Sequence, residues 1–246
     1  MKLTDRVYLV GSGAWGFGLS DDHDCHVYLL DGGSEAALID AGGGRDVSSI
    51  LKIIEDDGVP LDRIRYLLLT HGHGDHAAGA AELRERLGLQ VLIACKVAEF
   101  LRQGDERGIS LDVAKQAGVY PPDFCFRACP VDGELEEGQK VVVGDCELLV
   151  IETPGHSAGH LSFLMDRDGV QTFFGGDSIF FGGHIVLQNI PDCDLQAYLR
   201  TIERLSKLSV DVFLPGHLCF SLRDGQRHID AAMEILKTLG VPTNPT

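Results

Sequence analysis

Four side chains that can bind a metal ion stand within six positions of one another: His71, His73, Asp75 and His76. They follow the short apolar run Tyr66–Leu69, which is typical of a buried strand, and they precede an Ala-rich stretch that predicts a helix. Gly72 and Gly74 alternate with them, and we expect these glycines to let the backbone curl tightly without a Cβ clash. A lone histidine is usually an ordinary hydrogen-bonded residue, but HxHxDH at a strand-to-helix junction predicts a metal site.

Three more motifs place ligand types directly after apolar, strand-like runs. His156 and His160 stand in TPGHSAGH, Asp177 ends Gly-Gly-Asp, and His217 ends Pro-Gly-His. Taken alone, Gly-Gly-Asp and Pro-Gly-His are more often turns than ligand sites. Their order after HxHxDH yields five histidines and two aspartates, enough for two metal ions with positions left for water and substrate.

The apolar periodicity predicts an α/β (α+β) protein whose strands fall into two groups, each flanked by helices. Amphipathic helical patterns cover 47–54, 76–87, 195–205 and 225–239, and strand-like runs cover 5–10, 26–40, 66–69, 91–93, 140–174 and 210–214. Two sheets packed face to face with helices outside fit this order. We expect one domain over residues 1–246.

Residues 96–130 interrupt the alternation of strands and helices. They contain two short helical patterns, at 97–101 and 111–117, followed by Tyr120-Pro121-Pro122. This stretch is either a surface elaboration or an insertion over the site, and we favour a helical lid because such loops often set specificity.

Composition narrows the possible partners. The sequence has 21 basic and 37 acidic side chains, a formal charge of −16, which disfavours a nucleic-acid partner. It shows neither a signal-peptide pattern nor an apolar stretch long enough to span a membrane, so we expect a cytoplasmic protein with a small-molecule substrate. The oligomeric state is not indicated.

The ordered motifs resemble those of the metallo-β-lactamase-fold hydrolases, whose signature is HxHxDH, GHxxGH, an Asp and a late His. The resemblance covers residues 36–217 and implies an αββα sandwich. It further implies that one metal is held by His71, His73 and His156, the other by Asp75, His76 and His217, with Asp177 bridging the two. Asp40 and His160 would support these ligands without binding metal.

The resemblance to individual branches of this family is less complete. Asp177 disfavours the zinc β-lactamases, which commonly lack a bridging carboxylate at that position. Residues 177–183 resemble glyoxalase II, but His184-Ile185 replaces the Cys-Gly-Arg that continues those enzymes, and few residues follow Phe220 to form their glutathione-binding helices. Phe180 stands where the lactonases of the family have a tyrosine. The complete ligand set argues against a mononuclear iron persulfide dioxygenase but does not exclude this alternative. A non-catalytic metal-stabilised binding protein is a second alternative.

The function expected from these motifs is therefore dinuclear metal-dependent hydrolysis of a small ester, thioester or lactone. Two divalent ions can lower the pKa of a shared water toward neutrality, which makes a metal-bound hydroxide available as nucleophile. Asp75 is the candidate catalytic residue, since it can orient the hydroxide and take its proton. The donor set suits Zn²⁺ best, although iron and manganese also fit. Candidate substrate contacts are His184, Phe180 and Phe181, and Trp15 and Phe17 are further candidates for an acyl pocket.

Overall fold

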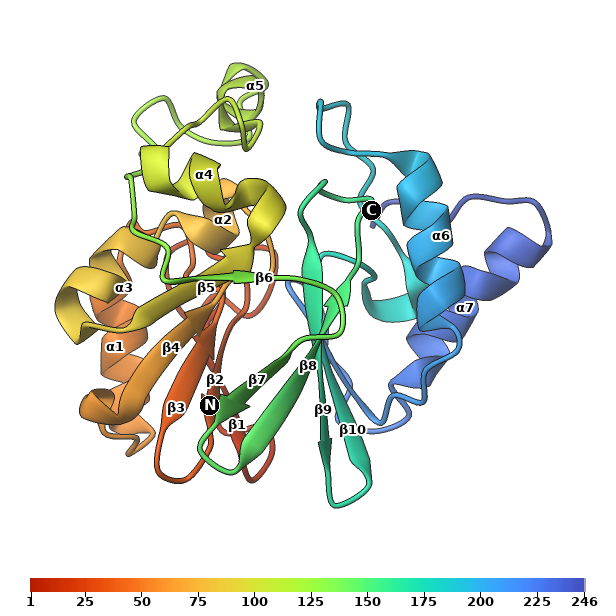
Figure 1. Cartoon of the computed structure of the whole chain (residues 1–246). Helices are drawn as coiled ribbons and strands as arrows, with labels where there is room; N and C mark the ends of the chain where they lie inside the picture. The colour runs from red at the N-terminus through yellow and green to blue at the C-terminus, as the bar shows by residue number, and fades with distance from the viewer. Residues whose placement is uncertain (246) are drawn as a thin grey trace.

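Two β-sheets lie face to face at the centre of the structure, and helices cover the outer face of each sheet (Figure 1). The computed structural model describes residues 1–245. This arrangement confirms the αββα sandwich expected from the sequence. Within residues 1–245, no helix has both the length and the apolar composition required to cross a bilayer.

The first sheet has six strands that lie side by side in sequence order. They are β1 (Val7–Gly11), β2 (Val27–Asp31), β3 (Ala36–Ile39), β4 (Ile64–Leu68), β5 (Gln90–Ala94) and β6 (Gly133–Leu135). The first three pair antiparallel, including the hairpin expected at Gly32-Gly33, whereas β3 to β6 pair in parallel. The sequence pattern predicts β1 to β5 but not the short strand β6.

The second sheet has five strands in the order β11-β10-β9-β8-β7. They are β7 (Lys140–Val143), β8 (Cys146–Glu152), β9 (Leu161–Arg167), β10 (Val170–Gly176) and β11 (Val212–Pro215). β7 to β10 form an antiparallel meander, and β11 joins β10 in parallel after a helical crossover.

Seven α-helices accompany the sheets within residues 1–245. They are α1 (Val47–Asp56), α2 (Gly74–Ala77), α3 (Ala80–Leu87), α4 (Cys95–Gln103), α5 (Leu111–Gln116), α6 (Leu195–Leu205) and α7 (Gln226–Lys237). Helices α1 to α5 lie on the side of the first sheet, and α6 and α7 cover the second (Figure 1). The helix expected over 76–87 is two helices, because the chain turns at Ala78-Gly79.

Apolar side chains form one large core and one smaller core. The large core lies between the sheets and under α1 and α3, and the apolar stripe of α1 is buried there as its spacing predicts. The smaller core, which includes Phe173, Tyr198, Ile202 and Ile229, joins the second sheet to α6 and α7. Burial on both sides keeps the strands rigid, so the loops at their ends are held in defined positions.

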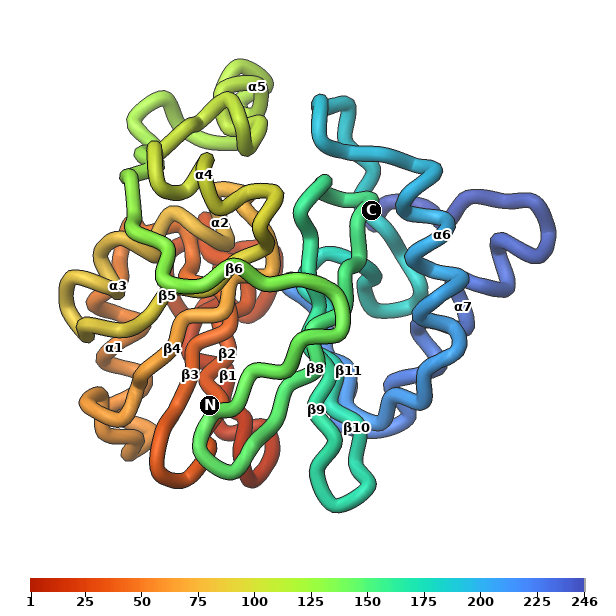
Figure 2. Tube along the Cα trace, in the orientation of Figure 1, coloured from red at the N-terminus to blue at the C-terminus, as the bar shows by residue number. Residues whose placement is uncertain are grey.

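One end of the sandwich is open between two groups of loops. Residues 96–130 stand above the first sheet, and the loop that leads into α6 stands above the second (Figure 2). Both segments contribute side chains to the same cavity.

Candidate metal centre

Four strand ends deliver the candidate ligands to this open end of the sandwich. His71 to His76 follow β4, His156 follows β8, Asp177 follows β10 and His217 follows β11. All seven candidate side chains belong to three groups, and within each group one donor atom per residue lies within 4.8 Å of the others: His71, His73 and His156; His71, His76 and Asp177; and Asp75, His76 and His217. The fold therefore gathers residues 146 positions apart, from His71 to His217, at one place.

The first group, His71, His73 and His156, turns ring nitrogens toward one point. His73 donates from Nε2 to a carboxylate and His156 donates from Nδ1 to the carbonyl of Val186, which leaves His73 Nδ1 and His156 Nε2 facing each other at 3.0 Å. Burial lowers the pKa of His156 to about 4, so its ring is neutral near pH 7. His156 Nε2 therefore offers a lone pair directly beside His73 Nδ1, an arrangement that fits a metal ion held by both rings.

The Nε2 atom of His71 is buried without a hydrogen-bond partner. Thr70 Oγ1 donates to Asp40 and lies 3.0 Å from His71 Nδ1, so His71 must supply the proton of that bond. Its Nε2 then carries a lone pair, and this atom is fully buried without any hydrogen-bond partner. Burial also holds the pKa of His71 well below its usual value, which excludes protonation of that nitrogen near pH 7. A metal ion would satisfy it.

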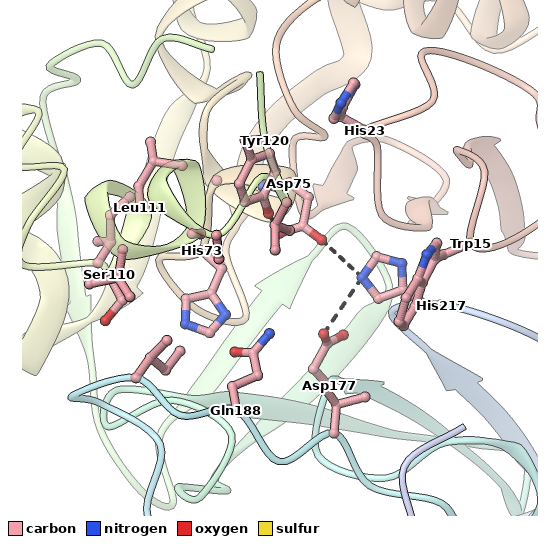
Figure 3. Close-up of a pocket in the computed structure, with 18 of the residues that line it drawn as sticks. Trp15, His23, His73, Asp75, Ser110, Leu111, Tyr120, Asp177, Gln188 and His217 are labelled. Atoms are coloured by element: carbon pink, nitrogen blue, oxygen red, sulfur yellow. Dashed lines mark hydrogen bonds and ion pairs between the residues drawn. The ribbon is translucent and has the colours of Figure 1, made fainter. Parts of the chain in front are cut away.

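The second group joins Asp75, His76 and His217. His76 Nε2 lies 3.2 Å from His217 Nε2, and His217 Nε2 lies 3.0 Å from Asp75 Oδ2. His76 donates from Nδ1 to Asp40 at 2.8 Å, so its Nε2 faces the other members of the group. Burial alone would lower the pKa of His76, but the acidic groups around it raise the pKa well above its usual value, and a metal ion at Nε2 would replace the proton. Figure 3 shows His217 reaching Asp75 on one side and Asp177 on the other.

Asp177 lies between the two groups. Its Oδ2 is 3.4 Å from His156 Nε2 and 3.6 Å from His217 Nε2, and its Oδ1 is 3.3 Å from His76 Nε2. Oδ1 is buried and has no hydrogen-bond partner. A buried carboxylate oxygen without a partner is costly, so this residue also fits a bound cation.

Asp40 supports the histidines, as its position after β3 predicts. Besides accepting from His76, it accepts from the backbone N–H of Thr70 at 2.7 Å and from the Thr70 hydroxyl at 2.8 Å. Asp40 itself has a left-handed backbone with φ of 64°, a conformation that aspartate tolerates better than most residues. This turn aims its carboxylate at the loop that carries His71 to His76.

His160 contributes in a different way from the one expected. Sequence reasoning predicts that it fixes the second nitrogen of a ligating imidazole. Instead, its Nε2 accepts the backbone N–H of Asp177 at 2.9 Å, while its Nδ1 donates to Thr153 Oγ1 at 2.7 Å. His160 therefore positions the main chain of Asp177, the candidate bridging residue. It lies next to the candidate centre but forms no hydrogen bond with another imidazole among the described residues.

The glycines of HGHGDH are required for a reason other than backbone curl. Neither Gly72 nor Gly74 has a positive φ. A Cβ on Gly72 would lie 2.9 Å from Ile109 Cγ2, and one on Gly74 would lie 2.9 Å from Phe124 Cε1. Ile109 and Phe124 belong to residues 96–130, so the glycines make room for that segment to pack on the ligand loop.

A cavity of about 800 Å³ opens above the candidate ligands. Residues Ile109 to Tyr120 form one wall, Val186 to Ile190 form the opposite wall, and Trp15 and Asp22 to Asp24 close a third side (Figure 3). Asp75, Asp177, His73, His156 and His217 lie at its floor. Residues 96–130 therefore contribute directly to the space in which a substrate would lie.

The three candidate substrate contacts are not among the cavity-lining residues. Phe180 is almost fully buried beneath His217, and Phe181 packs against His228 with ring centroids 4.3 Å apart. His184 Nδ1 lies 3.1 Å from the carbonyl oxygen of Thr243. The glycines at 182 and 183 both have positive φ, and they turn this segment away from the cavity.

Two side chains that touch the centre have no distinguishing sequence signal. Asp192 Oδ2 lies 3.1 Å from His73 Nε2, and the Tyr120 hydroxyl donates to Asp75 Oδ1 at 2.7 Å. Asp192 stands in the turn Ile190-Pro191-Asp192, and Tyr120 precedes two prolines. Neither belongs to a ligand motif, so only their positions in space reveal them.

Cys25 forms a further group of possible donors with Asp40 and His76. Its burial raises the pKa of the thiol, so the thiolate that a metal prefers is disfavoured there. Asp40 and His76 Nδ1 are already bonded to each other. This group therefore packs behind the candidate centre and is not a third metal site.

Comparison with known proteins agrees with this geometry. Residues 20–217 match the family model of the metallo-beta-lactamase superfamily. The chain belongs to this superfamily. The resemblance stated from HxHxDH and the later motifs is thereby confirmed.

Curated relatives of this superfamily member carry different names. It is 26% identical to the lactamase-like protein aptB of Emericella nidulans over 196 residues. The aligned region covers 78% of this chain and 50% of that protein. This chain is 34% identical over 200 residues to a hydroxyacylglutathione hydrolase of Cereibacter sphaeroides, covering 81% of this chain and 63% of that enzyme. The chain thus spans about half the length of the first of these relatives.

Solved structures share the fold. A Cronobacter sakazakii metallo-beta-lactamase with a HARLDQ motif superposes with a TM-score of 0.70 at 26% identity, covering 88% of this chain and 80% of that one. The subclass B3 metallo-beta-lactamase BJP-1 of Bradyrhizobium japonicum gives 0.73 at 22% identity, covering 97% and 91%. The second likeness is evidence for the fold alone.

Proposed function

We propose that this chain is a dinuclear metal-dependent hydrolase that acts on a small ester, thioester or lactone. In this proposal His71, His73 and His156 hold one ion, Asp75, His76 and His217 hold the other, and Asp177 bridges them. Zn²⁺ suits a site of imidazoles and carboxylates, so we predict zinc as the bound metal. A cytoplasmic location is a separate prediction.

One observation carries the proposal more than any other. The Asp177 carboxylate lies within 3.3 to 3.6 Å of an imidazole from each group, and its buried Oδ1 has no hydrogen-bond partner. A carboxylate in such a position can neutralise part of the charge of two cations at once. The match to the superfamily and the close approach of the His73 and His156 ring nitrogens support the same reading.

Two divalent ions, when bound, would supply a water with a pKa near neutrality and polarise a substrate carbonyl. The residues of the chain then have separate tasks. Asp75 lies at the cavity floor, where it can accept a proton from the attacking water, and Tyr120 fixes its Oδ1. Burial keeps His71 and His156 neutral near pH 7, which suits imidazoles that would hold a metal ion. The walls from 109–120 and 186–190 would flank a substrate whose carbonyl lies over the floor.

Metal analysis and a substrate panel test this proposal. The purified protein is expected to bind about two ions per chain and to hydrolyse at least one ester, thioester or lactone, with activity lost on chelation and regained with zinc. Asp177→Ala is expected to lose metal from both positions, because the carboxylate serves each. Two retained ions in that variant would remove Asp177 from the bridging role.

Other outcomes would identify the alternatives. One iron per chain with oxygen uptake on a persulfide would indicate a dioxygenase. Loss of stability on chelation, without turnover of any acyl substrate after zinc is restored, would indicate a metal-stabilised binding protein.

A further inference from the structure

The fully charged side chains that line the cavity are all acidic. Among the described residues that line it, none is lysine or arginine. Asp75 and Asp177 lie at the floor, where bound cations would compensate their charge. Two other carboxylates, those of Asp22 and Asp24, remain on the wall.

The walls away from the candidate ligands are mostly apolar. Ile109, Leu111, Val113, Ala114, Ala117 and Val119 line one side, and Val186 and Ile190 line the opposite side. Two large apolar side chains stay exposed at this cavity, Trp15 at 57% and Val119 at 61% of their surface. Exposed apolar groups of this size around a cavity are typical of a binding surface for an apolar group.

The polar side chains of the upper walls are neutral or acidic. Gln188, Asn189 and Ser110 can form hydrogen bonds without carrying charge. His23 is a lining residue, and its Nδ1 lies 3.1 Å from Asp21.

Cations of neighbouring segments are already paired with acids. Arg45 lies 3.9 Å from Asp21 and 3.6 Å from Asp123, and Lys115 binds Glu106 at 2.7 Å. Neither lines the cavity. An anionic group on these walls would therefore meet apolar atoms, carboxylates and uncharged hydrogen-bonding groups, and none of the described lining residues is a lysine or arginine that could offset its lost hydration.

We propose, on the basis of the hydrolase function above, that the substrate is an acyl compound whose groups remote from the scissile bond are apolar and uncharged. Thioesters of anionic carriers such as glutathione, which has two carboxylates, and coenzyme A, which has phosphates, are disfavoured. This separates the chain from the activity named for the hydroxyacylglutathione hydrolase relative. The carbonyl would lie over the floor, and the acyl chain would lie between residues 109–119 and 186–190.

Ligand binding tests the charge preference independently of hydrolysis. The chain has one tryptophan, Trp15, so its fluorescence reports on the cavity. Zinc-loaded protein is titrated with hexanamide and with adipic acid monoamide, which has the same length and a terminal carboxylate. An excess of acetate masks simple carboxylate binding to the ions, and at pH 8 the terminal carboxylate of the monoamide is ionised. Hexanamide is expected to bind about tenfold more tightly or better.

Hydrolysis of a matched pair of esters tests the preference for an uncharged substrate when the substrate is bound in the orientation that leads to reaction. 4-Nitrophenyl hexanoate and mono(4-nitrophenyl) adipate share the leaving group and chain length and differ in the terminal carboxylate. The neutral ester is expected to have a kcat/KM about tenfold higher or more, after correction for the uncatalysed rates.

An introduced cation should reverse part of the preference. Ala117 is exposed at the end of α5, where a lysine also suits the helix C-terminus, so Ala117→Lys should fold. Ala117→Gln is the uncharged control. Relative to that control, Ala117→Lys is expected to raise the ratio of kcat/KM for the adipate ester to kcat/KM for the hexanoate ester by about two- to fivefold.

The two proposals fail in different ways. Equal or tighter binding of the carboxylated amide, or equal or faster turnover of the adipate ester, overturns the substrate class and leaves a hydrolase. Preferential binding of hexanamide without hydrolysis of any ester supports the cavity assignment and overturns the hydrolase function.

Discussion

The imidazole of His73 donates a hydrogen bond from Nε2 to Asp192 Oδ2 across 3.1 Å, although the two residues stand 119 positions apart. The other oxygen of Asp192 accepts from Ser110 Oγ at 2.6 Å. Ser110 has a left-handed backbone with φ of 58° at the start of α5. One carboxylate thus orients a candidate metal ligand and joins the two loop segments that face each other across the cavity.

Replacement of Asp192 by alanine should therefore weaken metal binding. Without its partner, His73 can rotate or change tautomer, and loss of such a support typically lowers metal affinity about 10- to 100-fold. Competition with a chromophoric chelator measures this affinity. Asp192→Asn, whose amide oxygen can still accept from His73, should retain more of it. Ser110→Ala is the matched control, since it removes only the bond on the α5 side, and equal losses in both variants would contradict a role through His73.

Tyr120→Phe should reduce turnover more than it reduces stability. The hydroxyl donates to Asp75 Oδ1 at 2.7 Å, while the ring packs on Phe124 with centroids 4.5 Å apart, a contact that phenylalanine keeps. We expect kcat to fall about tenfold with little change in KM, because Asp75 loses its fixed orientation. The free energy of unfolding should fall by about 1 kcal/mol. Steady-state kinetics and urea unfolding measure the two effects, and an unchanged kcat would exclude this positioning role.

Gly72→Ala should destabilise the protein by forcing Ile109 away from the ligand loop. The new Cβ would lie 2.9 Å from Ile109 Cγ2, and such overpacking costs about 1 to 3 kcal/mol. Ile109→Ala removes the clashing atom, so the double variant should be less destabilised than the sum of its parts by about 1 kcal/mol. Gly74→Ala clashes with Phe124 and Leu111 instead, so Ile109→Ala should not rescue it. Additive effects for both pairs would contradict the proposed contact.

The stability of the fold should decrease in mild acid partly through His228. Burial, with a smaller effect of Arg227, lowers its pKa to about 4. His228 Nδ1 accepts from the backbone N–H of Gly182 at 3.0 Å, and Nε2 bonds to Ser221 Oγ at 2.7 Å. A second proton on the ring must displace the Gly182 bond.

The sign of this effect follows from the lowered pKa. The unfolded chain, with an ordinary histidine pKa near 6.5, binds the proton first, so stability is complete above about pH 6.5 and is lost as the pH falls toward 4. We expect His228 to account for about 1 to 2 kcal/mol of the loss between pH 7 and pH 5. His228→Asn should flatten this part of the curve in denaturant unfolding at several pH values. The same slope in both proteins would contradict the assignment.

Several features of the site follow directly from the sequence. The ligand types in HGHGDH, their place after an apolar run and the order of the later motifs predict the family, and the period of the apolar residues predicts the two-layered sheet core. These predictions succeed because metal-binding chemistry and the alternation of buried and exposed positions are local properties of the chain. The position of Asp40 after β3 belongs to the same class.

Other features depend on tertiary packing. Asp192 and Tyr120 reach the site from loops without a motif, Gly72 is required because Ile109 packs on it, and Phe180 lies beneath His217 instead of facing the cavity. The direction of a loop side chain depends on the backbone turns around it and on segments far away in sequence, and neither is encoded in residue type or spacing. The donors of the candidate centre could thus be identified from the chain alone, whereas the shape and charge of the cavity above them could not.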